Sequence, residues 1–103
     1  MYPELFLAPL LVNPNPSRGD KGVYFAWRLS APATMEVTVY SVAGQLVRRL
    51  PPFRAGAGPG EQHWDALNDH HVPVASGVFF AKISAVSDTG KRQQLWEQAS
   101  ILR

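Results

Sequence analysis

The sequence predicts an all-β fold, an antiparallel β-sandwich of about seven short strands. Every clear apolar pattern alternates with a period of two, as in strands that bury one face, and no stretch of useful length shows the helical period. Nine prolines and eight glycines fall mostly between the apolar runs, where they favour turns. The 103 residues, 46% hydrophobic and 11% aromatic, suffice for the core of one domain.

The first half of the chain contains three predicted strands. Apolar side chains alternate over residues 23–30 (VYFAWRLS) and again over 35–41 (MEVTVYS), and a tight Val-Ala-Gly connection leads into 45–50 (QLVRRL). Residues 51–60 (PPFRAGAGPG) are predicted to be a long loop. A short strand over 61–65 (EQHWD) and a second long turn region should follow.

The C-terminal half contains the longest alternating pattern, over residues 77–87 (GVFFAKISAVS). A Ser-Asp-Thr-Gly turn leads from it to 91–103, a last and partly polar strand, although the composition of that segment also fits a helix. Together with the apolar residues 9–12, these runs give about seven strands. We divide the chain into an apolar N-terminal segment or edge strand, 1–12, and a sandwich domain, 13–103.

Composition excludes several classes of function. The chain has no cysteine, so it can form neither disulfides nor zinc–thiolate sites. Its lysines and arginines are scattered and the net charge is only +2, whereas nucleic-acid binding needs a basic face. No apolar run reaches the roughly 18 residues of a membrane-spanning helix. We therefore expect neither nucleic acid as a partner nor insertion into a membrane.

Five short motifs, in a fixed order, resemble one family. They are NPNPSRG, VTVYSVAGQLVRRL, a glycine-rich loop, WD and VPVASGVFFAKI, within residues 10–103. This order resembles the immunoglobulin-like domain of flagellar hook-capping proteins and its relatives, the C-terminal sorting domains of type IX secretion cargo. The resemblance implies an Ig-like (fibronectin-like) sandwich in which the matched residues are structural. They are Asn13, Pro14, Asn15, Pro16, Val39, Tyr40, Gly44, Val47, Trp64, Asp65, Pro73, Ala75, Ser76, Gly77 and Phe79.

Physical reasoning agrees with structural roles for these positions. Gly44 and Gly77 stand where strands must turn sharply, so we expect φ > 0 at both. Trp64 should fill the core between the sheets, and Pro73 should fix its turn. The carboxylate of Asp65 is expected to bind the backbone of its own turn.

The sequence departs from the family pattern in its loops. Ser41 replaces a usual Asp, and Ala66 stands at the Gly of W-D-G. His70 or His71 falls near a Gly expected in the following turn. The final segment is also longer and more polar than the usual ending. The loop changes concern local conformation rather than the fold.

Other candidate sites have simpler explanations. His63, His70 and His71 suggest a metal site, but adjacent histidines on an extended segment point to opposite sides, and the nearby acids lack the spacing of a calcium loop. Ser76 lies outside a nucleophile elbow, and AGAGPG lacks the Lys-Ser/Thr of a phosphate-binding loop. We therefore expect no catalytic residue, no metal and no cofactor.

Apolar side chains in surplus predict a contact surface. The aromatic residues Tyr2, Phe6, Tyr24, Tyr40, Phe53, Phe80 and Trp96 cannot all face the core if the strands alternate. Contact with protein is the expected use, and a carbohydrate-binding face is the alternative. Phe6, Leu7, Leu10 and Leu11 should either fold back onto their own sheet or dock on a neighbour's edge strand. We favour the second arrangement, which predicts head-to-tail association.

These observations predict a non-catalytic structural or targeting module, with a carbohydrate-binding β-sandwich as the alternative. The resemblance implies a C-terminal sorting or assembly domain of a bacterial exported protein, located outside the cell or on its surface as part of a larger protein. The implied partners are proteins: secretion machinery, other domains of the parent protein, or copies of the chain in a homo-oligomer.

Overall fold

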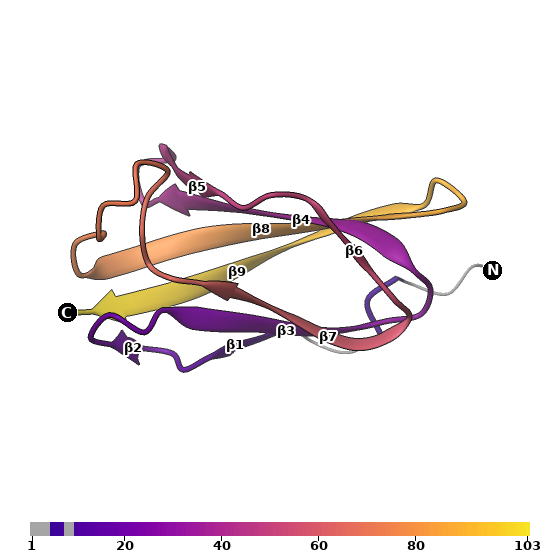
Figure 1. Cartoon of the computed structure of the whole chain (residues 1–103), viewed down its shortest axis with the longest axis horizontal. Helices are drawn as coiled ribbons and strands as arrows, with labels where there is room; N and C mark the ends of the chain where they lie inside the picture. The colour runs from indigo at the N-terminus through magenta and orange to yellow at the C-terminus, as the bar shows by residue number, and fades with distance from the viewer. Residues whose placement is uncertain (1–4, 8–9) are drawn as a thin grey trace.

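The computed structural model of the chain describes residues 5–7 and 10–103. Over these residues it contains nine strands and no helix, arranged as two sheets packed face to face (Figure 1). The predicted all-β sandwich is therefore confirmed. No helix long and apolar enough to cross a membrane occurs in the described part of the chain.

The smaller sheet has the strand order β1-β3-β7. It consists of β1 (Leu11–Asn13), β3 (Val23–Leu29) and β7 (Gly58–Trp64), all antiparallel to their neighbours. Alternate side chains of β3 are buried, as the sequence pattern predicts. These inward residues are Val23, Phe25, Trp27 and Leu29.

The larger sheet has the order β2-β9-β8-β4-β5, with β6 also paired to β4. Its strands are β2 (Ser17–Arg18), β4 (Ala33–Ser41), β5 (Leu46–Arg49), β6 (Phe53–Ala55), β8 (Gly77–Ser87) and β9 (Arg92–Leu102). The long strand β8 pairs with β4 on one side and with β9 on the other. These three strands form the centre of the sheet.

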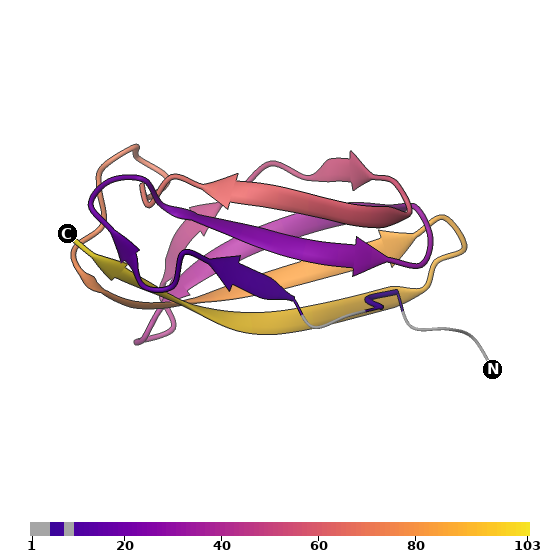
Figure 2. The ribbon, with the colours of Figure 1, turned by 90° about the horizontal axis from the view of Figure 1, so that it is seen from below.

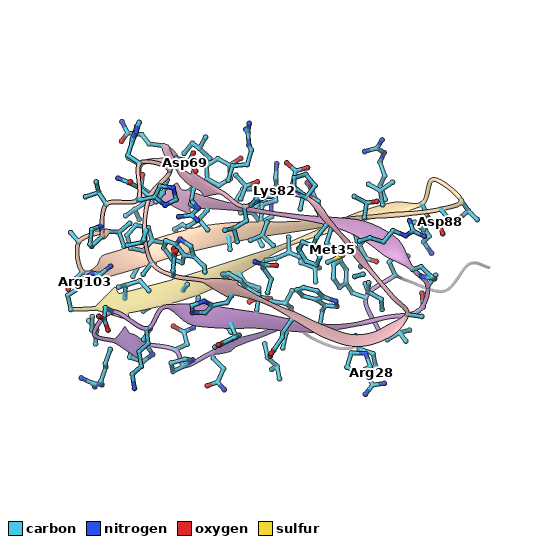
Figure 3. The ribbon with its side chains drawn as sticks, viewed as in Figure 1. Arg28, Met35, Asp69, Lys82, Asp88 and Arg103 are labelled. Atoms are coloured by element: carbon cyan, nitrogen blue, oxygen red, sulfur yellow. The ribbon has the colours of Figure 1, made fainter. Side chains whose placement is uncertain are left out.

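The core lies between the two sheets. Met35, which Figure 3 shows between the layers, is fully buried, as are Val37 and Val39 of the same strand. Trp64 is also fully buried, and its ring meets the ring of Phe79 edge-on at 5.5 Å. Trp64 therefore fills the space between the sheets, as expected.

One segment differs from the sequence prediction, and the final segment is the strand that was predicted. The predicted loop 51–60 contains β6 and the start of β7. A Cβ at residue 60 would lie 2.6 Å from the indole nitrogen of Trp27. Glycine at this position therefore lets the Trp27 ring pack closely against the strand, and it does not form a turn. The final segment, whose composition also fitted a helix, is the strand β9.

The described residues of the N-terminal segment, 5–7 and 10–12, lie against their own sandwich. Leu5, Phe6 and Leu10 are buried, and Phe6 forms an antiparallel bridge with Leu29. These residues therefore adopt the fold-back arrangement, which predicts a monomer. They do not adopt the arrangement that we favoured, docking on a neighbour's edge strand. Leu7 and Leu11, the other two apolar side chains of this segment, are 54% and 63% exposed.

Phe6 is consequently not one of the surplus aromatic residues. Tyr2 lies outside the described residues. The backbone nitrogens of Leu5 and Phe6 both donate to the side-chain oxygen of Gln93, at 2.9 and 3.2 Å. This polar side chain of β9 thus fixes the first described residues to the large sheet.

The motif NPNP carries the chain from one sheet to the other. Before it, β1 pairs with β3 in the small sheet; after it, β2 runs parallel to the end of β9 in the large sheet (Figure 2). The amide side chain of Asn15 donates to the carbonyl of Gln98 at 3.1 Å and accepts from the amide of Ser100 at 3.0 Å. The Asn15 side chain therefore supplies hydrogen bonds to β9 that the backbone of the crossing segment does not make.

Candidate functional site

Four of the family-like residues lie in the loop between β7 and β8: Asp65, Pro73, Ala75 and Ser76. Asp65 accepts a hydrogen bond from the backbone nitrogen of Leu67 at 3.1 Å, so its carboxylate binds its own turn as expected. It also forms an ion pair of 3.3 Å with Arg48. The guanidinium of Arg48 donates further to the carbonyls of Leu67 and Asn68, each at 3.2 Å. One arginine of β5 thus holds the start of this loop.

Arg103 holds the end of the same loop. Its backbone nitrogen donates to the hydroxyl of Ser76 at 2.8 Å. Its guanidinium donates to the carbonyl of Val74 at 2.6 Å and to that of Ala66 at 2.8 Å. Ser76 is therefore an acceptor for the backbone beyond β9, which is a structural use of its hydroxyl.

Two departures from the family pattern keep a glycine-like backbone. Ala66 and His71 both have φ of 61°. Ala66 stands at the Gly of W-D-G, and His71 lies near the Gly that the pattern has in the following turn. The side chain of Asn68 stabilises the second turn by accepting from the backbone nitrogens of His70 and Val72, at 2.9 and 3.0 Å. Pro73 lies in the same loop and forms a bridge with Leu67.

The expectation of positive φ is right for Gly44 and wrong for Gly77. Gly44 has φ of 82°, whereas Gly77 is the first residue of β8, is paired with Ile101, and is outside the left-handed region. A Cβ at Gly77 would meet no atom closer than 4.0 Å. A strand, rather than a turn, begins there, so a side chain at this position is tolerated.

The sequence pattern did not single out Gly22, the glycine at which an added side chain would clash most severely. Gly22 has φ of 72°, and a Cβ there would lie 1.9 Å from the carbonyl oxygen of Trp64. Its own carbonyl accepts a 2.6 Å hydrogen bond from the buried hydroxyl of Ser17. The sequence shows only a glycine before a strand, which does not reveal that β2, β3 and Trp64 meet at this point.

The three histidines have separate environments. His63 places a ring nitrogen 2.6 Å from the carbonyl of Lys21 and its ring 4.6 Å from that of Tyr24. His70 and His71 are exposed in the loop. Residues 5–7 and 10–103 include no group of three or more His, Cys, Asp or Glu side chains that could hold a metal ion.

Aromatic side chains gather on the outer face of the large sheet. Tyr40 lies opposite Phe80, and Lys82 lies opposite Trp96. These residues alternate with buried ones, so they face away from the core; Figure 3 shows Lys82 on that side. We call this surface the aromatic face. It comprises Tyr40, Val42, Leu46, Phe80, Lys82 and Trp96.

The aromatic face has a defined geometry. The rings of Tyr40 and Trp96 are 5.6 Å apart and inclined by 40°, and the ammonium of Lys82 lies 6.0 Å from the centre of the Tyr40 ring. A hollow opens here, bordered also by Val42 and Phe80. Trp96 is 54% exposed and Val42 73% exposed, so much apolar surface faces solvent.

The predicted surplus of aromatic residues is thus partly right. Tyr24 and Trp96 are exposed, Tyr40 and Phe80 are half-buried on the aromatic face, and Phe53 is half-buried against the ring of Trp27. The alternation in β4, β8 and β9 indicates which side chains point outward. It does not indicate that those of neighbouring strands meet, because strand order and register are not visible in the sequence.

Comparison with known proteins was made by sequence and by structure. No family model matches the chain, and no curated protein matches it. Among solved structures, dimeric latent PorU from Porphyromonas gingivalis superimposes with a TM-score of 0.73 at 20% identity, over 93% of this chain and 10% of that one. PorZ of the same organism, an essential bacterial surface component of the type-IX secretion system, gives a TM-score of 0.56 at 23% identity, over 91% of this chain and 11% of that one.

The chain therefore spans about a tenth of the length of PorU and of PorZ. A third structure, CopC from Methylosinus trichosporium OB3b, gives a TM-score of 0.59 at 12% identity, over 90% of this chain and 91% of that one. At these identities the likeness concerns the fold. Together with the two-sheet topology, it shows that the chain is an immunoglobulin-like β-sandwich.

Proposed function

We propose that the chain is a non-catalytic immunoglobulin-like module that serves the secretion of a bacterial exported protein through contacts with other proteins. The observation that carries the proposal is the likeness to a tenth of PorU, together with the likeness to PorZ, whose description places it in the type-IX secretion system. The motif order that resembles C-terminal sorting domains supports the same proposal. Its location would be outside the cell or at its surface.

The partners of the family-like residues support a non-catalytic role. Trp64 fills the core, Asp65 binds its own turn and Arg48, and Ser76 accepts from the backbone of Arg103. Each of these side chains is used to hold the fold together. Under the proposal, the surface of the module acts and its interior only supports that surface.

Within the proposal, a sorting role is favoured over assembly from identical copies. The reason is the position of the N-terminal segment, whose side chains Leu5, Phe6 and Leu10 are buried in their own sandwich. A segment held in this way does not supply a strand to a neighbour. The specific relation to flagellar hook-capping proteins stays a prediction.

The test is an export assay. The chain is fused behind a signal peptide and a fluorescent reporter in a bacterium with a type IX secretion system, and surface and medium fluorescence is compared with that of a strain lacking the system. We expect export from the first strain and periplasmic retention in the second. A matched fusion carrying Trp64→Ala, which opens the core, should be retained. Retention of the wild-type fusion in both strains would contradict the proposal.

A saccharide-binding module is the second candidate, because exposed rings such as that of Trp96 can stack on sugars. Titration with soluble polysaccharides, followed by tryptophan fluorescence, tests it. A saturable change that Trp96→Ala abolishes and Tyr24→Ala leaves intact would support this second candidate. All three tryptophans contribute to the fluorescence, so comparison with Trp96→Ala is needed to assign a change in fluorescence to Trp96.

A further inference from the structure

We infer that the aromatic face is the surface by which this module contacts its protein partner, and that the partner offers a carboxylate next to apolar side chains. The inference deepens the proposed function and rests on it. It assigns the contact to one face of the large sheet, built from β4, β5, β8 and β9 and from the turn after β4.

Apolar exposure is the first reason. Of the eight exposed large apolar side chains among the described residues, three belong to the aromatic face: Trp96, Val42 and Leu46. Exposed apolar surface gathered in one place marks contact sites, and Trp and Tyr dominate the energetics of protein interfaces. The other exposed large apolar side chains are spread over the N-terminal segment, the small sheet, the loop after β7 and the end of β9. They are Leu7, Leu11, Tyr24, Val72 and Leu102.

Charge is the second reason, and it identifies the chemistry of the partner. The two ion pairs among residues 5–7 and 10–103 are Arg48–Asp65 and Arg54–Asp88, so Lys82 has no carboxylate partner there. By register, the outward positions on this side of the sheet also include Arg49, Arg54, Arg92 and Glu36. Arg54 is paired with Asp88, so three cations outside the two ion pairs share this side with the carboxylate of Glu36. Such a surface complements an acidic partner and repels a basic one.

Rigidity is the third reason. Tyr40, Phe80, Lys82 and Trp96 stand on long paired strands, and Thr38, opposite Lys82, is almost completely buried. Because strand pairing already holds the backbone of these residues, a partner has only their side chains to order when it binds. The face is thus organised before contact, as a recognition surface requires.

A protein fits this face better than a polysaccharide does. The rings of Tyr40 and Trp96 are inclined by 40° and do not form a flat platform. Val42 and Leu46 add aliphatic groups that pack against apolar side chains, whereas sugars stack on rings. An apolar side chain of the partner would enter the hollow between the rings, and its neighbouring carboxylate would meet Lys82.

The experiment uses the export assay of the full-length fusion. Trp96→Ala and Lys82→Glu are compared with the wild type, with Lys82→Arg as the conservative change. Tyr24→Ala and Lys21→Glu are matched controls, because both residues are exposed and lie away from the aromatic face. Tyr24 is on the outer side of β3 in the small sheet, and Lys21 lies just before β3. Melting curves of the purified chains accompany every variant. Should Trp96→Ala melt markedly lower, Leu46→Glu on β5 replaces it.

We expect Trp96→Ala and Lys82→Glu to lower export about tenfold or more, corresponding to the loss of one central contact. Lys82→Arg and both controls should stay within about twofold. Export of Trp96→Ala and Lys82→Glu at wild-type levels would overturn the assignment of the face while leaving the proposed function intact. Loss with Trp96→Ala but not with Lys82→Glu would overturn the acidic protein partner and favour an uncharged ligand such as a saccharide. Failure of the wild-type fusion itself would overturn the proposed function, and this inference with it.

Discussion

Two residues of the loop after β7 adopt a backbone conformation that glycine accepts more readily. Ala66 and His71 have φ of 61°, and the left-handed region costs a residue with a Cβ about 1–2 kcal/mol. The fold tolerates this cost because Arg48, Arg103 and Asn68 fix the same loop through hydrogen bonds. The conformation is thus a property of the loop rather than of the residue that occupies it.

His71→Gly should therefore stabilise the protein. Relief of the left-handed strain outweighs the entropy that a glycine loses on folding, about 0.5–1 kcal/mol, so we expect a gain of about 0.5–1 kcal/mol in the free energy of unfolding. Urea denaturation measures it. His70→Gly is the matched control, since His70 is equally exposed and has no positive φ. That control should lose stability; a gain in both variants would contradict the argument.

A pair of glycines separates backbone strain from steric overlap. Gly19 and Gly22 have φ of 76° and 72°, but a Cβ at Gly19 meets nothing within 4 Å, whereas one at Gly22 would lie 1.9 Å from the Trp64 carbonyl. We expect Gly19→Ala to cost about 1–2 kcal/mol and Gly22→Ala about 3 kcal/mol or more. Thermal melting distinguishes them, and equal losses would show that β3 and Trp64 are not packed as described.

Among the elements, the crossing between the two sheets depends on a side chain. Asn15→Ala removes both hydrogen bonds to β9, to the Gln98 carbonyl and from the Ser100 amide. Because each exposed bond contributes about 0.5–1.5 kcal/mol, we expect a loss of about 1–2 kcal/mol and faster hydrogen exchange at Ser100. Asn13→Ala is the control, since the described residues give the Asn13 side chain no hydrogen bond. Unchanged exchange at Ser100 in Asn15→Ala would refute this role.

The turn between β8 and β9 is tied to β6 by an ion pair. The hydrogen bond from Arg54 holds the pKa of Asp88 below its usual range, and Asp88 in turn raises the pKa of Arg54. A carboxyl with a lowered pKa stabilises the fold above its ordinary pKa and loses this contribution as the pH falls through the lowered value. We expect an NMR titration to show a higher Asp88 pKa in Arg54→Gln. Salt should reduce the difference, because both side chains are exposed.

The elements differ in how far the sequence could predict them. Strands β3, β4 and β8 bury alternate side chains, so their periodicity was a sufficient signal. The segment holding β6 and the start of β7 was predicted to be a loop because its prolines and glycines are also typical turn residues. Gly60 is explained by the Trp27 ring, and Gly22 by the Trp64 carbonyl. Contacts of this kind join distant segments and leave no local pattern.

At the scale of the whole molecule, the large sheet carries exposed apolar side chains on its outer face. The inner residues of the long strands follow from alternation. The aromatic face could be predicted only as a surplus of rings, because its members come from strands far apart in the chain. Their meeting depends on the pairing of β8 with both β4 and β9.

The position of the N-terminal segment leads to a prediction about the whole molecule. Phe6 is buried in its own sandwich while its neighbour Leu7 is exposed, so Phe6→Ala should cost about 3–5 kcal/mol and Leu7→Ala no more than about 0.5 kcal/mol. Because the segment fills its own core, the chain should sediment as a monomer over a wide range of concentrations. If it instead docked on a neighbour, association would appear on raising the concentration and Phe6→Ala would abolish it. Sedimentation velocity of the three chains, combined with their melting temperatures, decides between the two arrangements.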